Sequence, residues 1–257
     1  MKHTGEPAVL EETRRRFKEI LTAHDLLEAE ISVTAKPLTA EEAIGNPERR
    51  DYPIIVGRER VMEAVLSGAK GHSFTDTPSH FRGTLQEVAD LDLDGNRNRA
   101  VFLATLNATL RHLGLAGGTV HCKDEDPEQC AREIAAHILE KHGRVRVGLI
   151  GLNPAIAEHL VHTFGSENVL MTDLNADNIG RKRFGVEVMD GRRRTDELID
   201  RSDFVILTGT TLVNGTFDHI WRRILADRKP YLVYGVTTAG VCALQDIDRI
   251  CPYGRDE

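Results

Sequence analysis

The chain has 257 residues and a formal net charge of −7. This length can form one large domain or two small ones with a substantial core, and the negative charge argues against a broad nucleic-acid-binding surface. No apolar run approaches the ~20 residues of a membrane span, and no signal peptide is evident. The four cysteines have no regular spacing, which argues against a disulfide framework. We expect a cytoplasmic protein with neither a nucleic-acid nor a membrane partner.

The first 93 residues mix helical and extended patterns without a clear repeat. The apolar spacing predicts helices over Pro7–Leu27 and Arg58–Ala69 and strands over Ile31–Ala35 and Tyr52–Val56. Residues 36–52 are polar, and residues 71–83 are dense in hydroxyl groups and turn residues, so both segments read as loops. This mixture of helical and extended patterns predicts a small α+β domain over residues 1–93.

The remaining residues, 94–257, alternate helical and extended patterns. A strong helix is predicted over Arg97–Leu113, and a second begins near Asp126 and Pro127 and ends at Gly143. Apolar strands are then predicted to alternate with helices. Their expected positions are Val145–Ile150, Val169–Asp173, Gly185–Met189, Phe204–Thr208 and Tyr231–Gly235. Such alternation is typical of an α/β fold with a mostly parallel, Rossmann-like sheet.

The turn after the first of these strands is the first candidate site. Gly151 ends the strand, and Asn153 can cap the next helix. Asp173 ends the second strand, where dinucleotide folds place a carboxylate that binds ribose. The turn has one glycine where the dinucleotide fingerprint has three, so Gly151 and Asp173 have an equally simple structural reading as a tight turn and a cap. A ribose-bearing ligand therefore stays one alternative of two.

The segment Thr208–Thr216 is the second candidate site. Threonine hydroxyls, Asn214 and two glycines follow a strand at the edge where open α/β sheets bind ligands. The alternative is that these hydroxyl groups only cap the loop and its helix. The density of small polar groups favours a ligand contact.

His121, Cys122 and Cys130 are the third candidate site, because imidazole and thiolate bind soft and borderline metals. Cys130 lies early in a predicted helix, where the helix dipole lowers the pKa of a thiol. The spacing matches no closed zinc motif, so a further ligand would come from elsewhere. The alternative is a buried cysteine beside a hydrogen-bonded histidine.

Asp76 and His80 are a fourth candidate, as an acid–base pair in the polar loop. A turn capped by the Asp76 side chain is the alternative that the loop composition favours. No catalytic serine elbow, phosphate-binding loop or metalloprotease helix motif occurs in the chain. The sequence alone leaves open whether the protein is an enzyme.

Several segments together resemble a prokaryotic family of putative heavy-metal chelation domain proteins. The matching segments are Phe74-Thr-Asp-Thr-Pro78, Phe81-Arg-Gly-Thr84, Asn107-Ala108, Thr119-Val-His-Cys-Lys-Asp124, Pro127-Glu-Gln-Cys130, Gly148-Leu-Ile-Gly-Leu-Asn-Pro154, Thr172-Asp-Leu-Asn175, Thr208–Thr216, Tyr234-Gly-Val-Thr-Thr-Ala-Gly240 and Arg249-Ile-Cys-Pro-Tyr-Gly254. The resemblance covers most of the chain.

This resemblance implies an N-terminal domain similar to the enolase N-terminal fold, a Rossmann-like domain over residues 94–257 and a site in the cleft between them. It also implies a link to metal chelation or cobalamin-type metabolism in anaerobic organisms, with an unidentified transition metal as cofactor. The implied metal ligands are His121, Cys122 and Cys130. The implied ligand contacts are Gly151, Asn153, Asp173, Asn175, Thr208, Gly209, Thr210, Thr211, Asn214, Gly215 and Thr216.

Three functions follow as hypotheses. The first is a protein that binds a metal ion or a metal-bearing small molecule in the cleft. The second is an enzyme that binds a nucleotide or an adenosylmethionine-like ligand over the Rossmann turn. The third is a non-catalytic assembly partner, and a homo-oligomer is compatible with each of the three.

Overall fold

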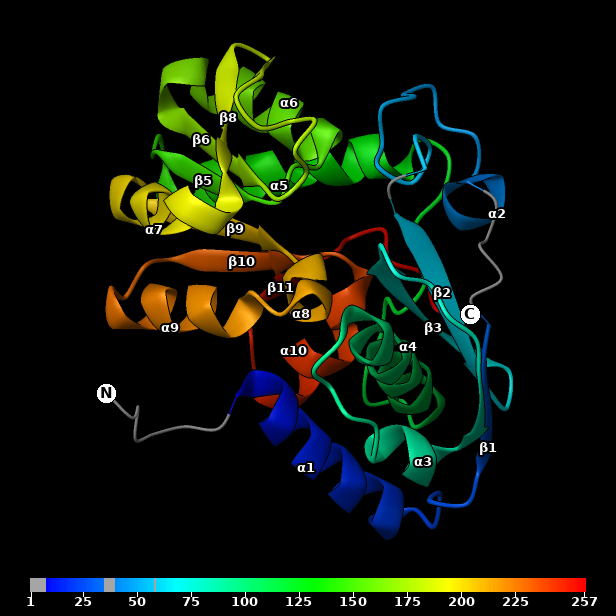
Figure 1. The fold of residues 1–257 in the computed structure, drawn as a ribbon. Helices are drawn as coiled ribbons and strands as arrows, with labels where there is room; N and C mark the ends of the chain where they lie inside the picture. The colour runs from blue at the N-terminus through cyan, green and yellow to red at the C-terminus, as the bar shows by residue number, and fades with distance from the viewer. Residues whose placement is uncertain (1–7, 35–39, 58) are drawn as a thin grey trace.

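A computed structural model describes residues 8–34, 40–57 and 59–257. The chain forms two sheets with helices packed around them (Figure 1). One sheet has four antiparallel strands, and the other has seven strands that are mostly parallel. The predicted α/β class is therefore confirmed. Pro7 and Ala35, at the ends of two predicted elements, lie outside the described residues, and within those residues no helix is long and apolar enough to cross a membrane.

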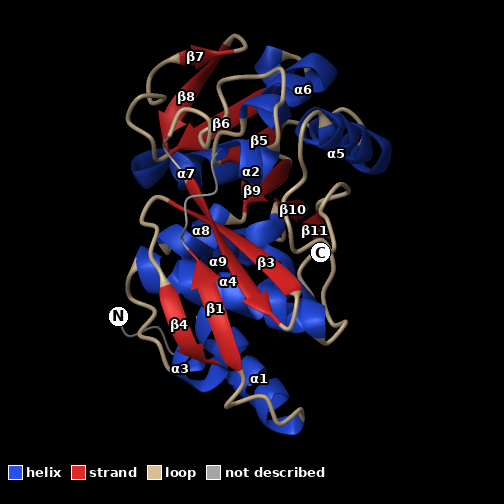
Figure 2. Ribbon diagram, turned by 90° about the vertical axis from the view of Figure 1, so that its right-hand side faces the viewer, coloured by secondary structure: helices blue, strands red, loops and turns tan. Residues whose placement is uncertain are grey.

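The smaller sheet has the strand order β3-β2-β1-β4. Its strands are β1 (Glu30–Thr34), β2 (Arg60–Leu66), β3 (Ala69–Thr75) and β4 (Phe81–Thr84). The helices of this half of the chain are α1 (Val9–Ala23), α2 (Ala40–Ile44), α3 (Leu85–Ala89) and α4 (Asn96–His112). In Figure 2 the antiparallel strands lie in front of α4, which packs against β2 and β3.

Helix α4 is the centre of this half because residues 100–110 are all buried. A helix that is apolar all round must have neighbours on every side, and α4 contacts the antiparallel sheet, α3, α8 (Thr210–Asn214) and α10 (Ala239–Gln245). Phe17 of α1 belongs to the same apolar cluster and meets Phe102 edge to face, with ring centroids 5.8 Å apart. The cluster continues under the parallel sheet, so the two sheets share one core. The boundary near residue 93 stays a prediction.

The helix predicted over Arg58–Ala69 is wrong where the structure describes it. Residues 60–66 form β2, which turns at Ser67 and Gly68 into β3. Met62, Ala64 and Leu66 alternate along the strand and join the shared core. The run of apolar residues fits a strand and a helix equally well, and pairing with distant segments decides between them.

The loop predicted over residues 71–83 is also wrong in part, because β3 and β4 occupy much of it. The segment looks polar, yet His72 and Ser73 are buried. Their polar atoms are satisfied from distant segments: Ser73 Oγ donates to the Ala100 carbonyl at 2.7 Å, and His72 Nε2 bonds to Glu63. Buried polar groups need such partners. The strand predicted over Tyr52–Val56 is instead a series of turns.

The larger sheet has the strand order β11-β10-β9-β5-β6-β8-β7. Its strands are β5 (Val147–Ile150), β6 (Val169–Asp173), β7 (Lys182–Arg183), β8 (Val186–Asp190), β9 (Phe204–Thr208), β10 (Tyr231–Tyr234) and β11 (Arg249–Ile250). All pairs are parallel except β7 with β8. The five strands predicted from the sequence for this half are all present.

Helices cover both faces of this sheet (Figure 1). One face packs against α5 (Asp126–His142) and α6 (Pro154–Phe164), whose apolar residues form one cluster with the strands. The other packs against α7 (Gly191–Arg201), α9 (Phe217–Ala226) and α10, which belong to the shared core. Because β5 pairs with β6 on one side and β9 on the other, the chain reverses direction across the sheet at β5. Ligands of open α/β sheets bind at the carboxyl ends of the strands at such a point.

Candidate functional site

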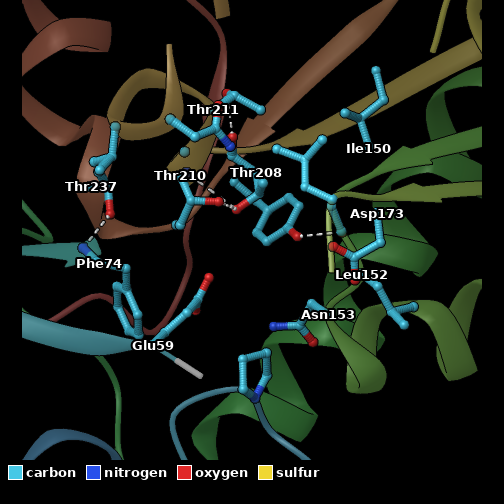
Figure 3. Close-up of a pocket in the computed structure, with 18 of the residues that line it drawn as sticks. Glu59, Phe74, Ile150, Leu152, Asn153, Asp173, Thr208, Thr210, Thr211 and Thr237 are labelled. Atoms are coloured by element: carbon cyan, nitrogen blue, oxygen red, sulfur yellow. Dashed lines mark hydrogen bonds between the residues drawn. The ribbon is translucent and has the colours of Figure 1, made fainter. Parts of the chain in front are cut away.

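A cavity of about 900 Å³ lies at the carboxyl ends of β5, β6, β9 and β10 (Figure 3). Its size is typical of a site for a small organic molecule. The structure brings every residue that the sequence proposed as a ligand contact or metal ligand to the wall of this one cavity. These residues are Gly151, Asn153, Asp173, Asn175, Thr208, Gly209, Thr210, Thr211, Asn214, Gly215, Thr216, His121, Cys122 and Cys130. Their roles as contacts stay predictions.

The turn after β5 is fixed by contacts within the protein, which leave little space beside it for a ligand. Gly151 has φ of +86°, and a Cβ built there would lie 2.3 Å from Thr208 Cγ2. The Tyr234 hydroxyl donates to the Gly151 carbonyl at 3.0 Å. Asn153 caps α6 as predicted, because its side-chain oxygen accepts from the Ile156 N–H. The glycine therefore allows β9 to approach the turn, and the space beside it is filled by Thr208.

Asp173 ends β6 with its carboxylate fixed by two donors. One oxygen accepts from the Asn175 N–H at 3.0 Å, and the other accepts from Asn178 Nδ2 at 2.7 Å. Each oxygen keeps acceptor capacity, since an ionised carboxylate has about four lone-pair positions. Asp173 is thus oriented within the cavity wall and can accept hydrogen bonds from a ligand (Figure 3).

The hydroxyl groups of Thr208–Thr216 are partly used inside the segment. Thr211 Oγ1 donates to the Thr208 carbonyl at 2.6 Å, and Thr216 Oγ1 donates to Asn214. Thr208 and Thr210 share a hydrogen bond of 3.2 Å between their hydroxyl oxygens and face the cavity (Figure 3). The capping alternative therefore accounts for Thr211 and Thr216. Thr208 and Thr210 still have acceptor capacity for a ligand.

His121 has a defined tautomer. Its Nδ1 lies 2.6 Å from the Cys122 carbonyl oxygen, which can only accept, so Nδ1 carries the proton. Burial lowers the pKa of His121 to about 4, so the ring is neutral at pH 7 and Nε2 has a free lone pair. The His121 backbone N–H donates to Nδ1 of His72, whose Nε2 bonds to Glu63 at 3.1 Å. His121 is therefore anchored at its backbone and its ring.

Cys122 and Cys130 are protonated thiols at neutral pH. Burial raises the pKa of Cys122 well above its usual range and that of Cys130 to about 12, and each is raised further by Cys251, a third cysteine of the lining. The expectation of a lowered pKa at Cys130 is therefore wrong. Cys130 lies beyond the first turn of α5, where the helix dipole has little effect.

These donors do not form a complete metal cage. Within residues 8–34, 40–57 and 59–257, no three His, Cys, Asp or Glu side chains are placed to hold a metal ion together. A bare ion needs about four ligands at about 2.0–2.3 Å when the ion is zinc. His121 Nε2 and a thiol deprotonated on binding can each serve as a single donor to a metal that brings its other ligands.

Asp76 and His80 make no acid–base pair. Asp76 accepts hydrogen bonds from the Thr77 hydroxyl at 2.9 Å and from Asn96 Nδ2 at 3.0 Å. His80 is exposed and does not line the cavity, whereas Asp76 does. The turn-capping interpretation is the one that the hydrogen bonds favour.

Glu59 is the functional candidate that sequence reasoning missed. It lies just before β2, is half-buried and lines the cavity (Figure 3). Burial raises the pKa of its carboxyl to about 7, and the negative charges of Asp173 and Asp76 raise it further. A carboxyl with such a pKa in a cleft is typical of a functional site. No local motif marks Glu59, because both neighbouring carboxylates come from distant parts of the chain.

Residues 134–246 match the sequence profile of the family DUF364, described as "Putative heavy-metal chelation". A DUF364 protein of unknown function from Pyrococcus horikoshii has a similar structure, with a TM-score of 0.54 and 13% identity over 89% of this chain and 79% of that chain. A second, from Desulfitobacterium hafniense DCB-2, has a TM-score of 0.44 and 15% identity over 72% of each chain. No curated protein matches the chain.

The first of these structures shows a shared fold. The likeness of the antiparallel half to the enolase N-terminal fold stays a prediction. Residues 134–246 cover α6, α7, α9 and the strands β5–β10, which together carry the Rossmann-like part of the cavity. This segment matches the DUF364 family model, and the family resemblance predicted from the sequence is confirmed.

Proposed function

We propose that the cavity binds a metal-bearing small molecule, and that one or two of His121, Cys122 and Cys130 are soft donors to its metal. The observation that carries this proposal is the orientation of the His121 ring, whose Nδ1 donates to a backbone carbonyl and whose Nε2 bonds to none of the described residues. Histidine ligands of metals are oriented in this way by a hydrogen bond from the other ring nitrogen. The family description, heavy-metal chelation, supports the same chemistry.

The size of the cavity favours a metal-bearing molecule over a bare ion. A volume of about 900 Å³ exceeds what one ion and its ligands need, and the described residues offer no complete cage. A complex that keeps most of its own ligands needs only one or two protein donors. The polar segment of Thr208 and Thr210 would contact the organic part of such a molecule.

The test uses protein purified anaerobically without a metal-affinity column. We expect near-stoichiometric transition metal in the wild-type protein, and at least tenfold less in a variant with Cys122→Ser and Cys130→Ser. The matched control is Cys242→Ser, since Cys242 is a buried free cysteine that does not line the cavity. Native mass spectrometry then distinguishes a bare ion from a metal-bearing molecule by the added mass. Undiminished metal in the double variant would remove these cysteines from the site.

A second candidate is a nucleotide or an adenosylmethionine-like ligand, and Asp173 favours it. The carboxylate lies at the end of the second strand of the Rossmann-like unit and is oriented by Asn175 and Asn178. Against it stands the turn at Gly151, where Thr208 fills the space that a pyrophosphate would need. The metal-bearing ligand is therefore the first choice.

Calorimetry with adenosylmethionine and ATP as probes tests this candidate. If Asp173 holds a ribose, Asp173→Asn weakens the binding of one probe at least tenfold, because bonds to a charged acceptor contribute about 1.5–3 kcal/mol. Asp246→Asn is the control, since Asp246 is exposed and lies outside the cavity wall. Equal affinity in the wild-type protein and in Asp173→Asn would exclude the ribose role.

A further inference from the structure

Glu59 differs from the other carboxylates of the cavity in its partners. Asp76 and Asp173 each accept two hydrogen bonds from the protein. Among the described residues, no side chain or backbone group donates to the Glu59 carboxyl or forms an ion pair with it. The Arg60 guanidinium donates to the Glu59 backbone carbonyl and leaves the carboxyl oxygens unused. In Figure 3 this carboxyl group extends into the open part of the cavity.

The charges around Glu59 are negative. The ionisable groups that interact with its carboxyl are Asp76 at the end of β3, Asp173 at the end of β6 and Tyr234 at the end of β10. In the part of the lining that the structure describes, Arg192 is the one arginine or lysine, and it begins α7 beside Asp173. Among the residues that the structure describes, none with a positive charge is paired with the Glu59 carboxyl. Ionising such a carboxyl costs free energy, unless a ligand places a positive charge beside it.

We infer that the ligand of this cavity carries a positively charged group and that Glu59 is the carboxyl that receives it. This inference rests on the proposed function, because it assigns the charge of the same ligand. A cation beside Glu59 would be attracted by the Glu59 carboxylate and, from further away, by Asp76 and Asp173. Because Glu59 is half-buried, its attraction for a cation is stronger than it would be in water. Neutral and anionic molecules of the same shape would be selected against.

Binding of a cation to Glu59 should release the proton of its carboxyl group. Burial and the two neighbouring carboxylates hold the pKa of Glu59 at about 7, so near neutral pH about half of the molecules carry its proton. A cation that binds the ionised form displaces this proton. Its apparent affinity then rises with pH by more than tenfold between pH 5.5 and pH 7.5, and binding releases a proton to the buffer.

Hexaamminecobalt(III) is a suitable probe, because it is a metal-bearing cation whose ammonia ligands do not exchange with thiols or imidazole. Its binding is measured by calorimetry at about 0.15 M salt, where distant surface charges are screened, in buffers with different ionisation enthalpies. We expect wild-type protein to show the tenfold pH dependence and the released proton. Glu59→Gln should bind the probe at least tenfold more weakly at pH 7.5 and show no pH dependence.

Two further variants complete the test. Glu140→Gln removes one exposed carboxylate outside the cavity and should behave as wild type. Asp76→Asn removes one negative neighbour of Glu59 and should move the pH midpoint of binding downward. It also keeps the test valid if Glu59→Gln fails to fold.

Three results would overturn the inference: no binding of the probe, equal binding by Glu59→Gln and wild type at pH 7.5, or pH-independent binding by wild type. Since the probe cannot bond to sulfur or imidazole, any of these results leaves the cysteine variants as an independent test of the proposed function. Loss of metal in the double cysteine variant together with a failed cation test would mean that the ligand is bound without Glu59.

Discussion

Glu59→Gln is expected to make the protein more stable at pH 8, although it removes a polar group of the cavity. The pKa of Glu59 is about 7 in the folded protein, compared with 4.5 for a solvated glutamate side chain. Between these values the folded state binds more protons than the unfolded state, so the stability of wild type falls as pH rises from about 4.5 to 7. The shift corresponds to about 3 kcal/mol at pH 8. Glutamine does not titrate and avoids this cost.

Urea unfolding of wild type and variant at pH 4.5 and pH 8 measures this effect. The stability difference in favour of Glu59→Gln should grow by about 3 kcal/mol between the two pH values. The control Glu140→Gln should show no such growth, because Glu140 is exposed and lies outside the cavity. A constant difference across this range would mean that Glu59 is already ionised and solvated at pH 5. An ionised group that destabilises the fold is typical of a residue retained for binding.

Gly151→Ala is expected to be the most damaging substitution in the site. An alanine Cβ at this position would lie 2.3 Å from Thr208 Cγ2, and the backbone has φ of +86°. The left-handed backbone costs an L-residue about 1–2 kcal/mol, and the clash adds about 1–3 kcal/mol. The turn would have to move away from β9, and the Tyr234 hydroxyl bond to the Gly151 carbonyl would be lost with it.

The variant Gly180→Ala separates the cost of the left-handed backbone from the cost of the steric clash. Gly180 has φ of +76°, but no atom lies within 4 Å of the Cβ that would be added. This variant should lose only the backbone part, about 1–2 kcal/mol. Thermal or urea unfolding of both variants gives the comparison. Equal losses at the two positions would show that Thr208 moves aside without cost and that the turn is not fixed by packing.

The Rossmann-like half was predictable from the sequence because its signals are local. The strands β5, β6 and β9 are short β-branched runs, and the residues at their ends begin helices with recognisable caps, such as Asn153 with Pro154. In a parallel sheet the carboxyl ends of all strands meet at one edge. The residues that follow the strands therefore had to meet, and Asp173 and Thr208 line the same cavity.

The antiparallel half was not predictable in the same way. β2 has apolar residues compatible with a helix, and β3 contains the buried His72 and Ser73. The polar atoms of these side chains bond to Glu63 and to a backbone carbonyl of α4. The residues of β3 alone therefore do not indicate a buried strand, because the groups that make its burial possible lie elsewhere in the chain. Hydrophobic periodicity does not report such partners.

The sequence by itself determined the α/β class, the order of the parallel strands along the chain and the residues that could bind a ligand. Only the tertiary structure decided that Glu59 belongs with them, that Asp76 and Asp173 are the charges that act on its carboxyl, and that the Cys122 and Cys130 thiols are protonated. The physical reason is that the secondary structure of the Rossmann-like half follows from neighbours along the chain. The charge state of a side chain instead depends on its burial and on charges that arrive from distant segments.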